Sequence, residues 1–108
     1  MSGHQNAIDD DIKPSEIEHK CEVIVAGAEV VERYNYFVYH FDCAGRYFWA
    51  KAYIDDISTV SVYGPFDGRE TRRLLPGVVD EAVLSYLKRR FTEIQTLGEA
   101  GYITIWAI

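Results

Sequence analysis

The stretch that decides the fold is YNYFVYHFDCAGRYFWAKAYID, which runs from Tyr34 to Asp55. Side chains alternate in character along both halves, and the turn sequence CAGR separates the halves. This pattern predicts two strands joined as a hairpin. Aromatic side chains are frequent enough to supply two sheet faces: Tyr34, Tyr36, Phe37, Tyr39, Phe41, Tyr47, Phe48, Trp49 and Tyr53. One face can form a core, and the second set of rings needs another explanation.

Short apolar runs separated by turn residues extend this hairpin into a meander. Strands are predicted at about 17–26, 30–42, 46–55 and 57–63. A loop rich in Gly and Pro follows over 64–77. Apolar residues at three- and four-residue spacing then predict a helix at about 78–97, and a β-branched run predicts a strand at 102–107.

The order ββββαβ predicts an α+β fold. We expect an antiparallel four- to five-stranded meander sheet with one helix packed on one face. The last strand fits either of two places, parallel beside the fourth strand or at the far edge. Residues 1–15 are polar and acidic and predict a flexible N-terminal arm, and residues 16–108 predict a single α+β domain.

The net charge of −6 comes from the front of the chain. Residues 1–32 hold eight acids and two lysines, whereas residues 33–108 hold nine residues of each sign. This balance argues against general binding of nucleic acid or of membrane surfaces, because both need clustered Lys and Arg. No apolar run is long enough to span a membrane, and the acidic start does not resemble a secretory signal, so we expect a cytoplasmic protein.

Two pairs of histidine and cysteine are candidate metal or catalytic sites: His19 with Cys21, and His40 with Cys43. On a strand, His40 and Cys43 point to opposite faces, which argues against a thiol nucleophile. The two pairs are expected to lie too far apart to share a zinc ion. We therefore predict free cysteines, no metal, no cofactor and no catalytic residue, and we favour a non-enzymatic protein.

Alternation sorts the side chains onto two faces if the turns are centred as predicted. The face expected under the helix carries Phe37, Tyr39, Phe41, Phe48, Ala50, Ala52, Ile54 and Ile57. The opposite face carries Cys21, Val23, Val25, Tyr34, Tyr36, Val38, His40, Tyr47, Trp49, Lys51, Tyr53, Val60 and Val62. Because one helix covers one face, we expect the opposite face to be bare.

An exposed face of Tyr, Trp and a central cation has the composition of a protein interface. The leading hypothesis is a protein–protein interaction module, with another protein or a second copy as partner. Its contact residues are predicted to be Tyr34, Tyr36, Trp49, Lys51 and Tyr53.

Two other classes of function remain open. A basic patch binding nucleic acid or an acidic partner is predicted at Arg69, Arg72, Arg73, Arg89 and Arg90. The acids at Asp9–Asp11 could instead dock on these arginines as an intramolecular lid. The third class is a small-molecule binder or enzyme with a pocket between helix and sheet, and we expect no such pocket.

Overall fold

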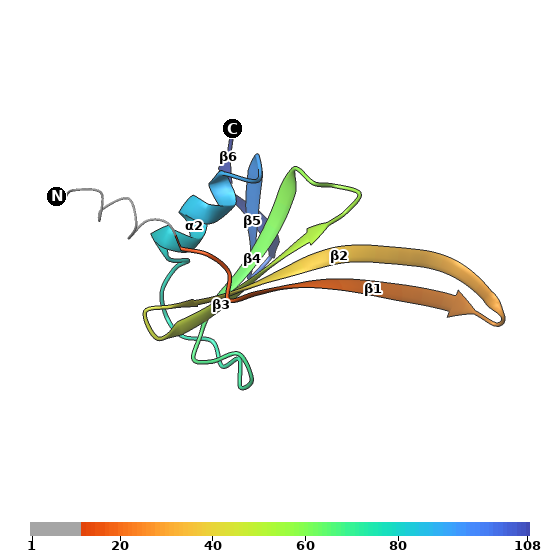
Figure 1. Cartoon of the computed structure of the whole chain (residues 1–108), viewed down its shortest axis with the longest axis horizontal. Coiled ribbons are helices and arrows are strands. Elements are labelled where there is room, and N and C mark those ends of the chain that lie inside the picture. The colour runs from red at the N-terminus through yellow and green to blue at the C-terminus, as the bar shows by residue number, and fades with distance from the viewer. Residues whose placement is uncertain (1–11) are drawn as a thin grey trace.

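The computed structural model describes residues 12–108 and shows a twisted six-stranded sheet with a short helix at one end (Figure 1). The strands are β1 (Glu16–Ala26), β2 (Glu29–Cys43), β3 (Arg46–Tyr53), β4 (Thr59–Phe66), β5 (Glu93–Gly98) and β6 (Gly101–Ala107). The helix is α2 (Glu81–Lys88). None of the helical structure in this part of the chain is long and apolar enough to cross a membrane.

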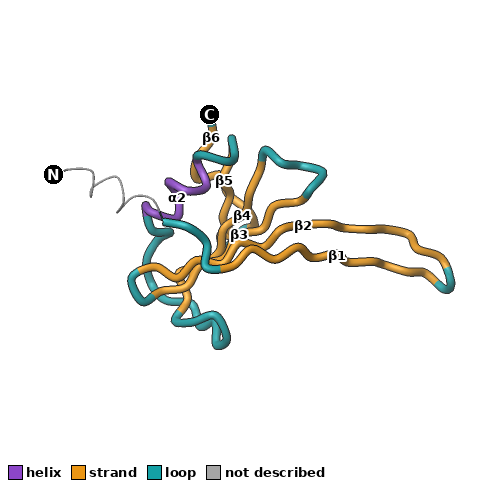
Figure 2. The backbone as a smooth tube through the Cα atoms, in the orientation of Figure 1, coloured by secondary structure: helices purple, strands orange, loops and turns teal. Residues whose placement is uncertain are grey.

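The sheet order follows the sequence, β1-β2-β3-β4-β5-β6 (Figure 2). Strands β1 to β4 form the predicted antiparallel meander. The chain then crosses through α2 and returns as β5, which is parallel to β4. Strand β6 closes the sheet as an antiparallel hairpin with β5. The predicted α+β class is confirmed, and the sheet has six strands, not four to five.

The extra strand lies in residues assigned to the helix by their spacing. The predicted helix over 78–97 is wrong in its second half, because α2 ends at Lys88 and Glu93–Gly98 forms β5. The position of Ile94 fits both the apolar spacing of a helix and the alternation of a strand, so periodicity could not decide between helix and strand for this segment. Pairing with β4 buries Ile94 completely beside Val60, and this burial favours the strand.

The main core lies between α2 and one face of the sheet, as predicted. Val83 and Leu87 of α2 are fully buried and pack with Phe41 and Phe48 of the sheet. The mid-strand alanines let the helix approach closely. The cluster consists of Phe41, Phe48, Ala50, Ala52, Val60, Val62, Val79, Val83, Tyr86, Leu87, Phe91 and Ile94. An ion pair between Arg46 and Asp80 fixes the start of α2 to the β2–β3 turn.

The predicted assignment of side chains to the two sheet faces is wrong in two places, because the strand pairing is shifted there. The β3–β4 connection is longer than a two-residue turn, so Ala50 pairs with Val62, and Val60 and Val62 lie under the helix. In the first hairpin Cys21 pairs with Asn35, not Tyr34, and lies on the helix side together with Val23. A bulge beside Ile24 accompanies this offset, and one residue of slip exchanges the two faces.

The distal half of the β1–β2 hairpin leaves the body of the molecule (Figure 1). Every residue from 19 to 34 is exposed, and we call this segment the hairpin projection. It gives the molecule its elongated extents of 63 × 27 × 26 Å. The projection has apolar side chains on both faces, including Val23, Ile24 and Val31. The sequence did not predict that these strands stand alone.

Leu87→Ala tests the core. Because Leu87 is fully buried under α2, we expect the substitution to lower the free energy of unfolding by about 2–5 kcal/mol. Leu97→Ala is the matched control, since Leu97 is 57% exposed and the same atoms are removed. Urea unfolding at neutral pH measures both. Equal losses for the two variants would contradict the assigned core.

Candidate binding surface opposite the helix

The sheet face away from α2 carries a row of tyrosines around one lysine. Register places Tyr36 beside Tyr53, Lys51 beside Ser61, and Trp49 beside Tyr63 on this surface, which we call the aromatic face. A groove of about 440 Å³ crosses it. Its lining is Lys51, Tyr53, Asp56, Thr59, Ser61, Tyr63, Glu93, Gln95 and Tyr102. A second hollow beside it shares Lys51 and reaches His40 and Arg72.

Lys51 is held between two rings at the centre of this face. Its Nζ lies 4.3 Å from the ring centroid of Tyr36 and 4.9 Å from that of Tyr53. Tyr36 donates a hydrogen bond of 2.6 Å to Glu22, and this bond together with burial raises the pKa of Tyr36 to about 12. Lys51 is half-buried, and these contacts place its charge against electron-rich ring faces.

The far end of the groove is built by a second aromatic group. Trp49 and Tyr63 stack with centroids 4.1 Å apart, and the hydroxyls of Tyr63 and Tyr102 lie 2.6 Å apart. Burial, followed by the bond to Tyr102, raises the pKa of Tyr63. The Trp49 indole N–H is buried and has no hydrogen-bond acceptor within residues 12–108. Tyr102 itself is 54% exposed, so its ring is open to contact.

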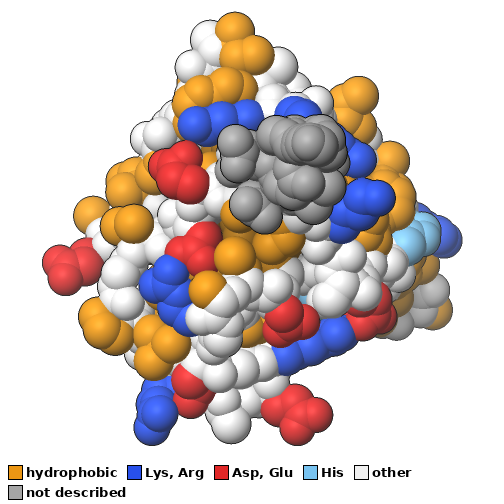
Figure 3. Space-filling model, turned by 60° about the vertical axis from the view of Figure 1, so that its left-hand side comes forward, with side chains coloured by type: hydrophobic (Ala, Val, Ile, Leu, Met, Phe, Trp, Pro, Cys, Tyr) orange, Lys and Arg blue, Asp and Glu red, His pale blue; other side chains and the backbone are white. Residues whose placement is uncertain are grey.

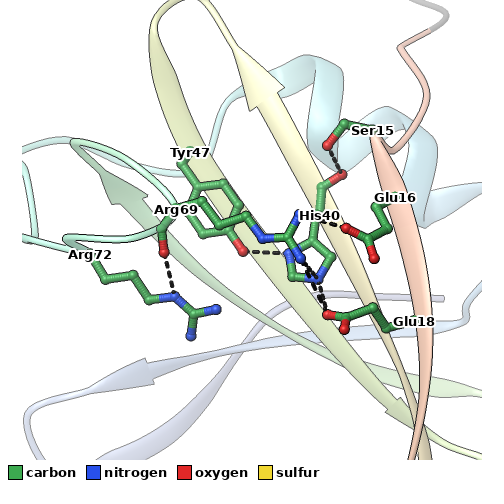
Figure 4. Close-up of polar contacts among 7 residues, drawn as sticks. All are labelled: Ser15, Glu16, Glu18, His40, Tyr47, Arg69 and Arg72. Carbon is green, nitrogen blue, oxygen red and sulfur yellow. Dashed lines mark hydrogen bonds and ion pairs between the residues drawn. The ribbon is translucent and has the colours of Figure 1, made fainter.

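A buried histidine organises the other end, where the hairpin joins the body (Figure 4). His40 is 1% exposed, with Nδ1 2.5 Å from the Tyr47 hydroxyl and Nε2 2.5 Å from Glu18. We assign the ring proton to Nε2, which donates to the carboxylate, while Nδ1 accepts from Tyr47. Arg69 adds a 2.6 Å bond to Glu16. The network therefore ties β1, β2, β3 and the loop after β4 together.

This network resembles a catalytic relay in composition, but both ring nitrogens of His40 already have hydrogen-bond partners. Tyr47 is 1% exposed, and burial raises the pKa of its phenol. The Arg72 guanidinium lies 5.7 Å from the ring centroid of Tyr47 and 5.2 Å from that of Trp49. A general base must reach the proton that it removes, and no polar atom of His40 remains unbonded. These hydrogen bonds link β1, β2 and β3.

The five predicted contact residues are brought together on the aromatic face, but they differ in exposure. Tyr34 and Tyr53 are 36% and 41% exposed, Trp49 and Lys51 are half-buried, and Tyr36 is buried. The expectation of a bare face is therefore wrong in part. Buried side chains on it also include Val38, His40 and Tyr47.

The predicted arginines lie on two different sides of the sheet. Arg72 covers rings on the aromatic face, whereas Arg90 lies 4.2 Å from the ring centroid of Tyr86, on the helix side. Arg69 binds Glu16, and Arg73 pairs with Asp67 at 3.2 Å. Arg89 lines a hollow with Arg90. On the surface seen in Figure 3, basic side chains are scattered among acidic ones.

The suggested lid formed by Asp9–Asp11 lies outside the described residues. In the described part of the chain, no cluster of His, Cys, Asp and Glu is suited to hold a metal ion. Cys21 and Cys43 are free thiols there, and burial raises the pKa of Cys43.

Sequence reasoning missed the contribution of the later strands to the face. Gln95 and Glu93 lay in the predicted helix, so their place in the groove was hidden by the wrong element assignment. Tyr102 could have been found, because it follows a turn and begins an alternating strand. A predicted hairpin over 93–107 would have placed Glu93, Gln95 and Tyr102 on one surface.

Comparison of the chain with protein-family models, with curated proteins and with solved structures gives no match.

Glu18→Gln tests the network at the root of the hairpin projection. The hydrogen bond from His40 lowers the pKa of Glu18, so the folded state binds its proton less readily than the unfolded chain. The carboxylate then stabilises the fold above its ordinary pKa of 4.5, and this contribution disappears as pH falls through the lowered pKa. We expect the variant to unfold at lower urea than the wild type at pH 7, with the difference shrinking below pH 4.5.

Glu70→Gln is the control, because this substitution removes the same charge from a residue that is exposed in the loop after β4. If the loss of stability to urea caused by Glu18→Gln stays constant from pH 7 to acid pH, the hydrogen bond assigned between His40 and Glu18 is contradicted.

Proposed function

We propose that this chain is a non-enzymatic protein–protein interaction module that binds its partner on the aromatic face. The observation that carries the proposal is the half-exposed row of tyrosines around Lys51, with an open groove running through it. Tyrosine supplies a large rigid contact area and a hydroxyl for hydrogen bonding, at small cost in side-chain entropy. Tyrosine and other aromatic residues are enriched in the cores of protein interfaces.

The shape and charge of the groove favour a protein over a small molecule. Its lining spans four strands, from Lys51 on β3 to Tyr102 on β6, and alternates rings with short polar groups. One lysine faces two acids, Asp56 and Glu93, so the groove has no single sign of charge. A phosphate-bearing ligand needs concentrated positive charge, which this lining lacks. Extended protein segments match such mixed surfaces through side-chain contacts and hydrogen bonds.

One observation favours the second candidate, an acidic partner or a nucleic acid. Arg72 lies over Trp49 and Tyr47, and an arginine beside rings is a device for holding single strands. Against it, Arg69 and Arg73 already pair with carboxylates, and Arg90 lies on the other side of the sheet. A salt titration separates the two candidates, since phosphate contacts weaken steeply with salt and ring burial does not.

Site-specific photo-crosslinking tests the proposed surface. A benzophenone side chain placed at Tyr53 is expected to capture a partner protein in the native cell, because Tyr53 lies at the open edge of the groove. Glu81 is the control position, since it is exposed on α2 and away from this face. The captured protein is then purified, and its affinity is measured by calorimetry.

Tyr53→Ala and Tyr102→Ala are each expected to weaken that affinity about tenfold or more, because interface aromatics carry much of the binding energy. Glu81→Ala should leave it unchanged. Capture with equal yield from Glu81, or affinities that do not respond to either tyrosine, would contradict the proposed surface.

A further inference from the structure

We propose that β1 pairs antiparallel with β1 of a second copy of this chain, joining two sheets edge to edge along their hairpin projections. The surface involved is the outer edge of β1, which is separate from the groove. The side chains of Lys20 and Glu22 lie at the border of the aromatic face, where Glu22 accepts a hydrogen bond from Tyr36. The tests still differ, because Tyr53→Ala and Tyr102→Ala alter the groove and leave β1 unchanged.

The edge of β1 is long, and no strand lies beside it within residues 12–108. β1 has eleven residues and a single neighbouring strand, β2, among residues 12–108. A two-stranded hairpin is marginal in water, and exposed edges are ready templates for another strand. Apolar side chains stand along this edge without cover: Ile17 is 51% exposed and Val25 is 59% exposed. Natural sheets discourage such pairing with short edges, proline, bulges or charged side chains. β1 is long and contains no proline, and its charged residues, Glu16, Glu18, Lys20 and Glu22, have both signs, so they disfavour some alignments and favour others.

The hydrogen-bond pattern shows which backbone groups face outward. Ile54 N–H donates to the Asn35 carbonyl at 3.0 Å, so odd-numbered residues of β2 bond towards β3 and even-numbered residues towards β1. Tyr36 pairs with Lys20, so even-numbered residues of β1 bond towards β2. The N–H and C=O groups of residues 17, 19, 21, 23 and 25 therefore point away from the sheet.

One register pairs the whole strand with itself, and it is the register centred on Cys21. Glu16 and Ala26 are the ends of β1, and Cys21 lies midway between them. Two copies then place residues 17 and 25, 19 and 23, and 21 and 21 opposite one another, so every outward-facing group meets an outward-facing group. The same register sets Lys20 opposite Glu22 of the second copy, twice by symmetry. Opposite charges facing across strands stabilise the pair.

Neighbouring registers gain less from charge. Centring on Lys20 sets two lysines opposite each other, and centring on Glu22 sets two glutamates opposite each other. Centring on His19 sets Glu22 opposite Glu16 twice and Lys20 opposite Glu18 twice, so repulsion offsets attraction. Centring on Val23 sets no charged residue opposite another and leaves residues 16–19 unpaired. Among these registers, the one centred on Cys21 alone combines two attractive pairs, no repulsive pair and the full length of β1. The other free edge, β6, contains no charged residue and so has no means of selecting a register by charge. The sequence of β1 thus specifies both a partner and an alignment.

Charge reversal tests this pairing by sedimentation of the full chain. The wild type is expected to sediment as a dimer. Lys20→Glu and Glu22→Lys are each expected to raise the dissociation constant at least about tenfold, because two attractive pairs become two repulsive ones. Mixing these two variants restores both pairs between unlike chains, and the double variant restores them between like chains, so both samples are expected to sediment as dimers again.

Arg33→Glu and Glu32→Lys are the controls, because they make the same charge changes on β2 of the same projection. They are expected to leave the dissociation constant unchanged, and circular dichroism should show that every variant is folded. A monomeric wild type would overturn the proposal, as would a dimer that tolerates both single reversals or loses affinity equally in the controls. Failure of the mixed variants to reassociate would overturn the assigned register.

Discussion

The structure depends on a mismatch between one short helix and one long strand. At about 1.5 Å per residue, the eight residues of α2 extend ~12 Å, whereas the fifteen residues of β2 extend ~50 Å at about 3.3 Å each. Val83 and Leu87 therefore seal one face of the sheet only near its base. The opposite face and the far half of the first hairpin have no helix to cover them.

The two uncovered regions are stabilised in different ways. On the aromatic face the protein uses its own side chains: Arg72 covers Trp49, Lys51 lies between two rings, and His40 is bonded at both nitrogens. Buried polar groups that are fully paired fix strand positions, and this network holds the root of the first hairpin. Beyond Glu18 no comparable covering exists among the described residues, and both faces of the projection are exposed. Those are the surfaces on which partners are expected.

The local pattern predicted the meander and the centre of the helix-covered face, because alternation and helical spacing are local signals. The expectation that Ile54 and Ile57 lie under the helix is wrong, since they are 41% and 75% exposed. The local pattern failed at Ile94, where helical spacing and strand alternation coincide. It also failed at Cys21 and Val62, where a different length of turn or a bulge changes the strand pairing. The aromatic residues of the site were found from composition, but the burial of Tyr36 and the half-burial of Trp49 depend on Glu22, Lys51 and Arg72, which only the tertiary structure brings near. The projection had one readable signal: the strand predicted at 30–42 is longer than its partner at 46–55.

Residue-resolved hydrogen exchange of the β1 amides tests most directly whether the projection is completed by a second chain. Amides of even-numbered residues bond to β2 and should be protected at every protein concentration. Amides of residues 17, 19, 21, 23 and 25 should exchange freely in dilute solution and become protected as concentration rises, because they acquire partners only in the dimer. Odd-numbered amides that exchange freely at all concentrations would contradict the account.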